Sequence, residues 1–189
     1  NGLCNTYTDQ MTITLNPAPK VNAGVDKTVC ADVLTVLLNG QILHANGGSW
    51  TTSGTGSFSP NNTTLNANYI PSAQDTINGF VTLTLTTTGN GLCNAYADQM
   101  TITLNPAPKV NAGPDITVCA DKGSITLNGS IVNVTGGIWT TSGSGTFSPN
   151  ASTLNANYIP SVADTTLGSV TLTLTTTGNG LCNAYSDQM

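Results

Sequence analysis

Cysteine is the residue type whose spacing in this chain points most directly to chemistry. Cys4, Cys93 and Cys182 follow one another at intervals of 89 residues, and Cys30 and Cys119 repeat the same interval. Cysteine pairs that recur in small, loop-rich units are typical of disulfides in an oxidising compartment. The spacing predicts the bridges Cys30–Cys93 and Cys119–Cys182, with Cys4 left for a partner in a preceding unit. Such a bridge contributes about 4 kcal/mol in the chain-entropy model; unpaired buried cysteines are the alternative.

Aspartate is the only acidic residue type, and it recurs at equivalent positions of the repeat. Calcium takes six to eight oxygen ligands, several of them carboxylates. Asp26 and Asp32, with their copies Asp115 and Asp121, flank one predicted strand near the start of each unit. The dense alternating aspartates of a calcium loop do not occur in the sequence. We therefore expect solvated turn aspartates, no metal and no cofactor, with calcium at these four residues as the alternative.

Trp50 and Trp139 also stand one repeat apart, each after a Gly-rich turn signal. An alternating stretch follows each tryptophan, which predicts a core side chain packed on the disulfide. The alternative is an exposed indole that stacks on sugars and forms a surface-binding site.

The sequence contains few residues that could form a catalytic site. The single histidine, His44, is replaced by Asn133 in the second unit, so a function shared by both units cannot depend on it. The chain also contains no phosphate-binding glycine loop, no HExxH, no CxxC and no G-x-S-x-G. The prediction is that the protein is not an enzyme.

Charged residues are few, and the net charge is negative. The formal net charge is −5, and the four basic side chains are all lysines that do not cluster. Nucleic acid is excluded as a partner, because phosphates require clustered lysine and arginine. Membrane insertion is excluded too, because threonine and asparagine interrupt each hydrophobic stretch well before the ~20 residues that span a bilayer.

The elements that must position these residues are strands, because apolar side chains recur with period two. In residues 80–88, for example, Val81, Leu83 and Leu85 alternate with threonines. Six further strands are expected, at 27–30, 35–39, 49–53, 57–59, 65–70 and around 100–104. A single helical turn capped by serine is predicted at 72–75 and again at 161–164. About seven short strands per unit, separated by Gly- and Asn-rich turns, predict an all-β, immunoglobulin-like β-sandwich.

The uninterrupted 89-residue interval divides the chain into copies of one module. Residues 1–19 are expected to be the C-terminal fragment of a preceding repeat, 20–108 a complete repeat, and 109–189 a second repeat truncated at its last strand. The repeats meet at residues 105–109, where two prolines stiffen an extended link. Tandem domains joined in this way predict a semi-rigid rod.

The order of sequence motifs resembles a known group of repeats. The runs VNAGPDITVCA, GGIWTTSGSGTFSPNASTLNANYIPS and GSVTLTLTTTGNGLCNAYSDQM together resemble the tandem Ig-like or PKD-like repeats of giant Bacteroidota cell-surface adhesins, most closely those of SprB-type gliding-motility adhesins. The resemblance implies export by the type IX secretion system and a thin filament on the cell surface. Asp75-Thr76-Ile77 and Asp164-Thr165-Thr166 resemble the O-glycosylation signal of the same bacteria, which implies sugar on Thr76 and Thr165.

The expected function is structural. Each repeat serves as a spacer in an extracellular stalk that carries an adhesive region away from the cell, in gliding motility or attachment. The alternative is a repeat-borne module that binds glycans or surfaces through Trp50 and rows of threonine, with avidity from repetition. The expected partners are adjacent repeats of the same chain, with polysaccharide, solid surfaces and other copies in a fibre as further candidates.

Overall fold

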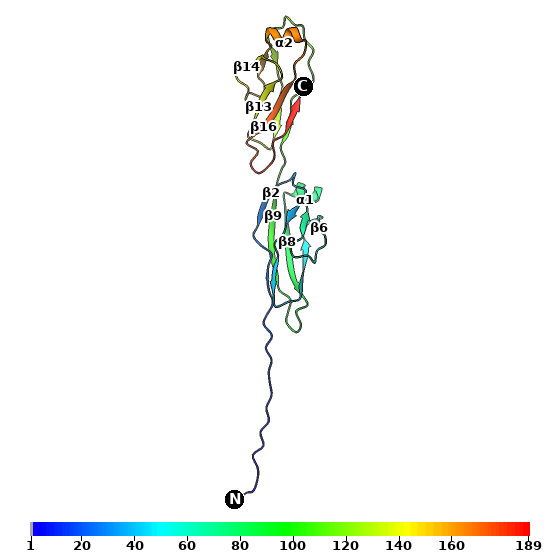
Figure 1. The fold of residues 1–189 in the computed structure, drawn as a ribbon, viewed down its shortest axis with the longest axis vertical. Helices are drawn as coiled ribbons and strands as arrows, with labels where there is room; N and C mark the ends of the chain where they lie inside the picture. Colours follow the sequence, from blue (N-terminus) through cyan, green and yellow to red (C-terminus); the bar gives the residue numbers. More distant parts are fainter. Residues whose placement is uncertain (1) are drawn as a thin grey trace.

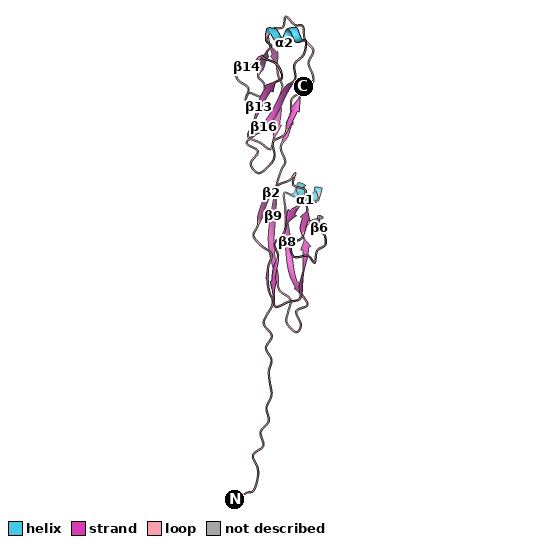
Figure 2. Cartoon of the chain, viewed as in Figure 1, coloured by secondary structure: helices cyan, strands magenta, loops and turns pink. Residues whose placement is uncertain are grey.

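The computed structural model describes residues 2–189 as two β-sandwich units that lie end to end, preceded by an extended segment (Figure 1). Asn1, the first residue of the expected 1–19 fragment, lies outside the described residues. Strands dominate both units, and each also contains one short helix (Figure 2). The prediction of an all-β sandwich is confirmed.

The first unit runs through nine strands and one helix. In chain order they are β1 (Lys20–Asn22), β2 (Lys27–Cys30), β3 (Val36–Leu37), β4 (Gln41–Leu43), β5 (Gly47–Thr52), β6 (Ser57–Ser59), β7 (Asn68–Ile70), α1 (Ala73–Asn78), β8 (Phe80–Thr88) and β9 (Ala97–Asn105). One sheet has the order β2-β9-β8-β5, a second has the order β3-β7-β6, and β1 pairs with β4. The pairing of β2 with β9 is parallel, with Lys27 opposite Ile102 and Cys30 opposite Asn105. The C-terminal ends of β2 and β9 therefore lie side by side at one end of the unit.

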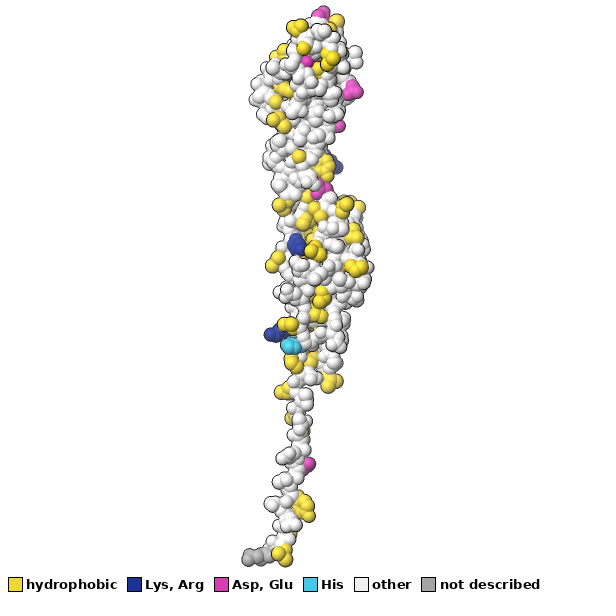
Figure 3. Space-filling view, in the orientation of Figure 1, with side chains coloured by type: hydrophobic (Ala, Val, Ile, Leu, Met, Phe, Trp, Pro, Cys, Tyr) yellow, Lys and Arg dark blue, Asp and Glu magenta, His cyan; other side chains and the backbone are white. Residues whose placement is uncertain are grey.

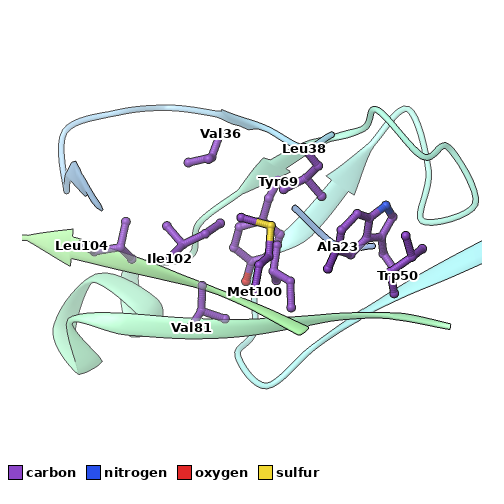
Figure 4. Packing of buried hydrophobic residues seen from close by; sticks show 11 residues of the cluster. Ala23, Val36, Leu38, Trp50, Tyr69, Val81, Met100, Ile102 and Leu104 are labelled. Atoms are coloured by element: carbon purple, nitrogen blue, oxygen red, sulfur yellow. The ribbon is translucent and has the colours of Figure 1, made fainter. Parts of the chain in front are cut away.

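The core lies between the two sheets. Alternate residues of β8 and β9 point inward, so Val81, Met100, Ile102 and Leu104 face Tyr69 and its neighbours across the sandwich (Figure 4). After Phe80, the outward residues of β8 are threonines, which suit the solvated face of a sheet. The period-two pattern of the sequence thus places the core correctly.

Gly47 and Gly48, expected in a turn, belong to β5 instead. Gly48 pairs with Thr87 and is buried. A Cβ atom on Gly48 would lie 3.0 Å from Leu85 Cδ1 and 3.1 Å from Leu65 Cδ2, so the glycine lets two leucines close over the strand. The turn before β5 is made at His44, whose φ is 58°, and at Asn133 in the second unit. Both residue types tolerate a left-handed backbone, which explains the exchange of histidine for asparagine.

Helix α1 is stabilised by hydrogen bonds in its first turn. Ser72 is the N-cap: its hydroxyl accepts a hydrogen bond from Asp75 N, while the Asp75 carboxylate accepts one from Ser72 N. This capping box confirms the serine-capped turn predicted from the sequence. Gly79 ends the helix with a φ of 78°.

The second unit repeats the order of elements in the first, but it lacks the equivalent of β2 and its last two strands are shorter. Its elements are β10 (Lys109–Asn111), β11 (Ile125–Thr126), β12 (Ser130–Val132), β13 (Gly136–Thr141), β14 (Thr146–Ser148), β15 (Asn157–Ile159), α2 (Val162–Leu167), β16 (Leu172–Thr177) and β17 (Ser186–Gln188). Residues 116–119, the equivalent of β2, form no strand. In the first unit, β2 pairs with Ile102–Asn105 of β9, whereas the last strand of the second unit, β17, ends at Gln188. The apolar side chains on this side consequently line a surface pocket, with Ile116, Ile125 and Val170 among them.

Residues 2–19 run as an extended segment without helix or strand (Figure 1). Met11, Ile13 and Leu15 are exposed along it, although their equivalents in β9 are buried core residues. None of the sheets of the described residues includes this segment.

Candidate functional site: the joint between the two units

The boundary between the units is built from strand ends and a proline linker. β2 ends at Cys30 and β9 ends at Asn105, whose carbonyl accepts a hydrogen bond from Ala31 N at 2.7 Å. The chain then passes through residues 106–108, which include two prolines, and enters β10 at Lys109. Cys30 is therefore fixed beside the point where the chain leaves the first unit.

A disulfide crosses this boundary. Cys30 of the first unit is bonded to Cys182 of the second, with their Cα atoms 5.0 Å apart and a separation of 152 positions in sequence. Cys182 lies in the loop between β16 and β17, next to the linker, with its Sγ 3.9 Å from Pro106 O. Within residues 2–189, Cys4, Cys93 and Cys119 carry free thiols.

The predicted pairings Cys30–Cys93 and Cys119–Cys182 are therefore wrong. β9 spans nine residues, so its two ends are about 30 Å apart at roughly 3.3 Å per residue. Cys30 is opposite Asn105 at one end, whereas Cys93 lies in the hairpin loop before the other end. A disulfide requires Cα atoms within about 7 Å. The two cysteines of one unit thus stand at opposite ends, and each faces a neighbouring unit.

The hairpin loop that presents Cys182 has a defined local structure. Gly178 and Gly180 adopt φ values of 67° and 60°, and Cys182 N donates a hydrogen bond to Asn179 O at 3.0 Å. Tyr185 N then donates to Thr176 Oγ1 as the chain returns to the sheet. Positive φ at the two glycines turns the chain sharply, which aims the cysteine at the first unit.

A polar contact accompanies the bridge. Tyr185 Oη donates a hydrogen bond to Asp32 Oδ2 at 3.1 Å, and Asn183 Nδ2 donates to the same oxygen at 3.5 Å. The hydrogen bond to Asp32, followed by partial burial and the negative charge, raises the pKa of Tyr185 above its ordinary value. Sequence reasoning treated Asp32 as a turn residue and did not select Tyr185. The signal available was that Asp32 and Tyr185 each lie close to a cysteine in the sequence.

The four aspartates considered for calcium do not come together. Asp26 Oδ1 accepts a hydrogen bond from Thr101 N at 2.8 Å and so fastens β2 to β9. Asp32 belongs to the joint, where it is grouped with Cys30 and Cys182 within 4.8 Å. Both sulfur atoms of that group are in the disulfide, so Asp32 is its single oxygen donor. Asp115 and Asp121 occupy the equivalent positions of the second unit, and calcium binding stays a prediction.

The tryptophans are not a surface-binding site. Trp50 and Trp139 are each 1% exposed, and their Nε1 atoms donate hydrogen bonds to Leu65 O and Leu154 O. The expectation of core tryptophans is correct, but that of packing on the disulfide is not. Trp50 lies at one end of the core cluster and Leu104, near Cys30, at the other (Figure 4). An indole enclosed in this way offers no face to a sugar.

The residues singled out for O-glycosylation lie on the short helices. Thr76 is half-buried on α1, and its hydroxyl donates to Ser72 O at 3.1 Å; Thr165 is at the same place on α2. Asp75, which precedes Thr76, is buried and accepts hydrogen bonds from Tyr69 Oη, Ser72 N and Thr55 N. The aspartate therefore has a structural role of its own. Modification of Thr76 and Thr165 stays a prediction.

The comparisons with known proteins leave the family open. No family model matches the chain, and no curated protein matches it. Solved structures of modest similarity include Drosophila N-cadherin EC1-4, with 13% identity, a TM-score of 0.48, and 92% of this chain and 48% of that chain covered. Protocadherin Gamma B2 extracellular cadherin domains 3-6 gives 14% identity, a TM-score of 0.46 and coverage of 90% and 45%. The chain thus spans somewhat less than half the length of these two proteins.

A third similar structure, human Protocadherin-24 EC1-2, has 12% identity, a TM-score of 0.48, and coverage of 92% of this chain and 95% of that chain. Similarities at these scores are too weak to assign a family or a role. The fold is assigned from the strands, registers and cores described above. No helix within residues 2–189 is long and apolar enough to cross a membrane.

Proposed function

We propose that this chain is a length-giving segment in the stalk of a large extracellular bacterial adhesin, which holds an adhesive region away from the cell surface. The observation that carries the proposal is the disulfide between Cys30 and Cys182. It joins two copies of one module across their boundary, so that they lie end to end. A spacer needs this property, because added units extend the filament only when each joint resists folding back.

The linker and the polar contact support the same function. Two prolines restrict the backbone between the units, and the Asp32–Tyr185 hydrogen bond adds a second fixed point. Three connections at one boundary limit rotation about any one of them.

The flanks of the rod suit a spacer better than a binding module. In the view of Figure 3, charged side chains are few and lie singly among scattered hydrophobic side chains and uncharged surface. The outward face of β5 and β8 presents hydroxyl groups, including Ser49, Thr51 and Thr84. The burial of Trp50 and Trp139 removes the stacking platform, which was one of the two features on which the binding alternative depended, the other being the rows of threonine. We therefore place glycan or surface recognition outside these repeats.

The resemblance to Bacteroidota repeats guides the finer part of the proposal. It favours cell-surface display through type IX secretion and a role in gliding motility or attachment, with adjacent repeats as the constant partner and other copies of the chain as a further one. An inter-unit disulfide suits a protein that matures in an oxidising compartment.

Deletion of whole units in the bacterium that produces the protein tests the function. Filament length, measured by electron cryotomography, should fall in proportion to the number of deleted units, while adhesion to the same surfaces persists. As a companion measurement, the purified chain should not bind polysaccharides or glass in a quartz-crystal microbalance. Saturable binding by the purified chain, together with loss of adhesion on deletion, would establish a binding module instead.

A further inference from the structure

The second unit contributes three residues to the joint, and the first unit carries the same three in the same order. Cys182, Asn183 and Tyr185 face the first unit. One repeat earlier stand Cys93, Asn94 and Tyr96, on the corresponding loop between β8 and β9. The loop at the free end of the first unit thus carries every group that the second unit uses to make its contact.

The opposite face of the joint is also duplicated. The first unit contributes Cys30 and Asp32, and the second unit carries Cys119 and Asp121 at the equivalent positions. Cys119 is exposed, whereas the bonded Cys30 is 1% exposed. Each of the two units therefore has a cysteine and a nearby polar partner at both ends.

The hairpin cysteine is already positioned at the free end. Cys93 Sγ lies 3.7 Å from Pro17 O, in the proline linker before the first unit, as Cys182 Sγ lies 3.9 Å from Pro106 O. Cys93 N donates to Asn90 O at 3.1 Å, which repeats the contact of Cys182 N with Asn179 O. The free thiol thus occupies the place relative to its linker that the bonded sulfur occupies in the joint.

Side-chain exposure shows what a neighbouring unit covers. Leu181, beside the bonded cysteine, is 65% exposed, whereas its equivalent Leu92 is 95% exposed. Tyr185 is 39% exposed and its equivalent Tyr96 is 50% exposed. The β8–β9 loop of the first unit, which faces no folded neighbouring unit within residues 2–189, therefore leaves exposed the side-chain surface that a neighbour would bury.

We propose that Cys93 and Cys119 are the two half-sites of this same bridge to further units. Cys93 bonds to the β2-end cysteine of the unit before it, and Cys119 bonds to the hairpin cysteine of the unit after it. Every unit is then linked covalently to both neighbours, in addition to the peptide backbone. This inference rests on the proposed function only for the presence of neighbouring units.

Bridge formation is a two-electron oxidation. Two thiols lose two protons and two electrons and form one S–S bond. The electrons pass to an oxidised dithiol oxidoreductase or a small-molecule disulfide, which is reduced to thiols. The exchange proceeds through a mixed disulfide that the second thiolate resolves.

A protease that cleaves before aspartate tests the pairing, because it places each cysteine on its own peptide: residues 1–8, 26–31, 75–97, 115–120 and 164–186. In the purified chain, peptide 26–31 should be joined to 164–186. The chain is then extended by completing the second unit and adding one further copy, and oxidised with glutathione disulfide. Peptide 115–120 should now be joined to the hairpin peptide of the added copy, and three thiols should remain free.

The alternatives give different products. Bridges within units would join 26–31 to 75–97 and leave one free thiol in the extended chain, which would overturn the proposal. Persistence of 115–120 as a free thiol would overturn it as well. The Cys119→Ser variant of the extended chain should lose the new bridge and keep Cys30–Cys182. Electron micrographs separate this inference from the stalk function: units in line without the second bridge refute only the bridge, whereas units folded back on one another refute the stalk.

Discussion

Asp32 and Tyr185 meet across the boundary between the two units, although 153 residues separate them in sequence: Tyr185 Oη donates a hydrogen bond to Asp32 Oδ2 at 3.1 Å. Each residue lies within three positions of a bridged cysteine. The joint therefore combines a covalent bond with an adjacent polar contact, and the two constrain the same pair of loops.

Replacement of Asp32 should change the titration of Tyr185. The hydrogen bond to Asp32 holds the pKa of Tyr185 above the ordinary tyrosine value of about 10, so Asp32→Asn should lower it toward that value. A folded-state pKa that is raised contributes stability below pH ~10, and this stability is lost as the pH rises through the higher folded value. Tyrosine NMR shifts between pH 8 and 13 measure the change. Asp121→Asn is the matched control, and an equal shift in both variants would contradict the contact.

Reduction should lengthen the chain under tension. When the two termini are pulled, the shortest covalent path crosses the Cys30–Cys182 bond, so the segment between these cysteines, which are 152 positions apart, bears no load. A reducing agent should therefore add about 500 Å of contour length, at roughly 3.4 Å per residue. Single-molecule force spectroscopy gives this length directly. Cys119→Ser should behave like the unmodified chain, and equal lengths with and without reductant would show that the bridge does not form.

The buried aspartates at the helix caps should make stability depend on acid. Burial raises the pKa of Asp75, but hydrogen bonds from Ser72 N, Thr55 N and Tyr69 Oη outweigh it, and the pKa is lowered. Hydrogen bonds from Ser144 N and then Ser161 N lower the pKa of Asp164 to about 2. A depressed pKa contributes stability that is present above the unfolded value of about 3.9 and is lost as the pH falls through the folded value.

The corresponding variant is Asp75→Asn. It should cost about 2–3 kcal/mol at neutral pH, because a buried donor loses its charged acceptor. It should also weaken the fall in stability between pH 4 and 2. Urea unfolding at several pH values measures both effects. Ile77→Ala, on the exposed side of the same helix, should change stability by less than about 0.5 kcal/mol; similar behaviour of the two variants would refute the role of Asp75.

Gly40 should tolerate no side chain. A Cβ atom there would lie 2.8 Å from Trp50 Cζ2 and 2.8 Å from Leu85 Cδ2, inside a packed core. Gly40→Ala should therefore destabilise the first unit by about 1–3 kcal/mol. Gly123→Ala, where no atom lies within 4 Å of the added carbon, is the control for thermal unfolding. Unfolding temperatures that fall equally in the two variants would argue against close packing at the tryptophan.

Much of each unit could be predicted because its strands follow local rules. The expected bounds of β2, β6 and β8 agree with the structure, since strict alternation and glycine-rich turns mark their ends. The serine-capped helix was also predictable from four residues. β1 and β4 were not predicted from the sequence. Each is three residues long and has one partly buried apolar side chain, Val21 or Ile42, so it is too short to show a hydrophobic period.

The joint could not be predicted from spacing alone. A repeat that places cysteines near both ends of each unit allows bonds within a unit and bonds between units with equal regularity. The choice depends on the parallel pairing of β2 with β9, which carries Cys30 to the end of the unit opposite Cys93. Parallel pairing of β2 with β9 depends on contacts between residues distant in sequence, so no local sequence pattern predicts it. The burial of Trp50, by contrast, was predicted from the alternating stretch in which it lies.

The residues of the joint also bear on how such a gene can change. Each boundary is made from positions that recur every 89 residues, so the end of one copy fits the beginning of any other. Unequal recombination that inserts or deletes whole copies leaves every remaining boundary with its cysteine pair, aspartate and tyrosine. Filament length can then drift between lineages without any repair of the contacts, whereas an insertion within the joint itself would displace a cysteine from its partner.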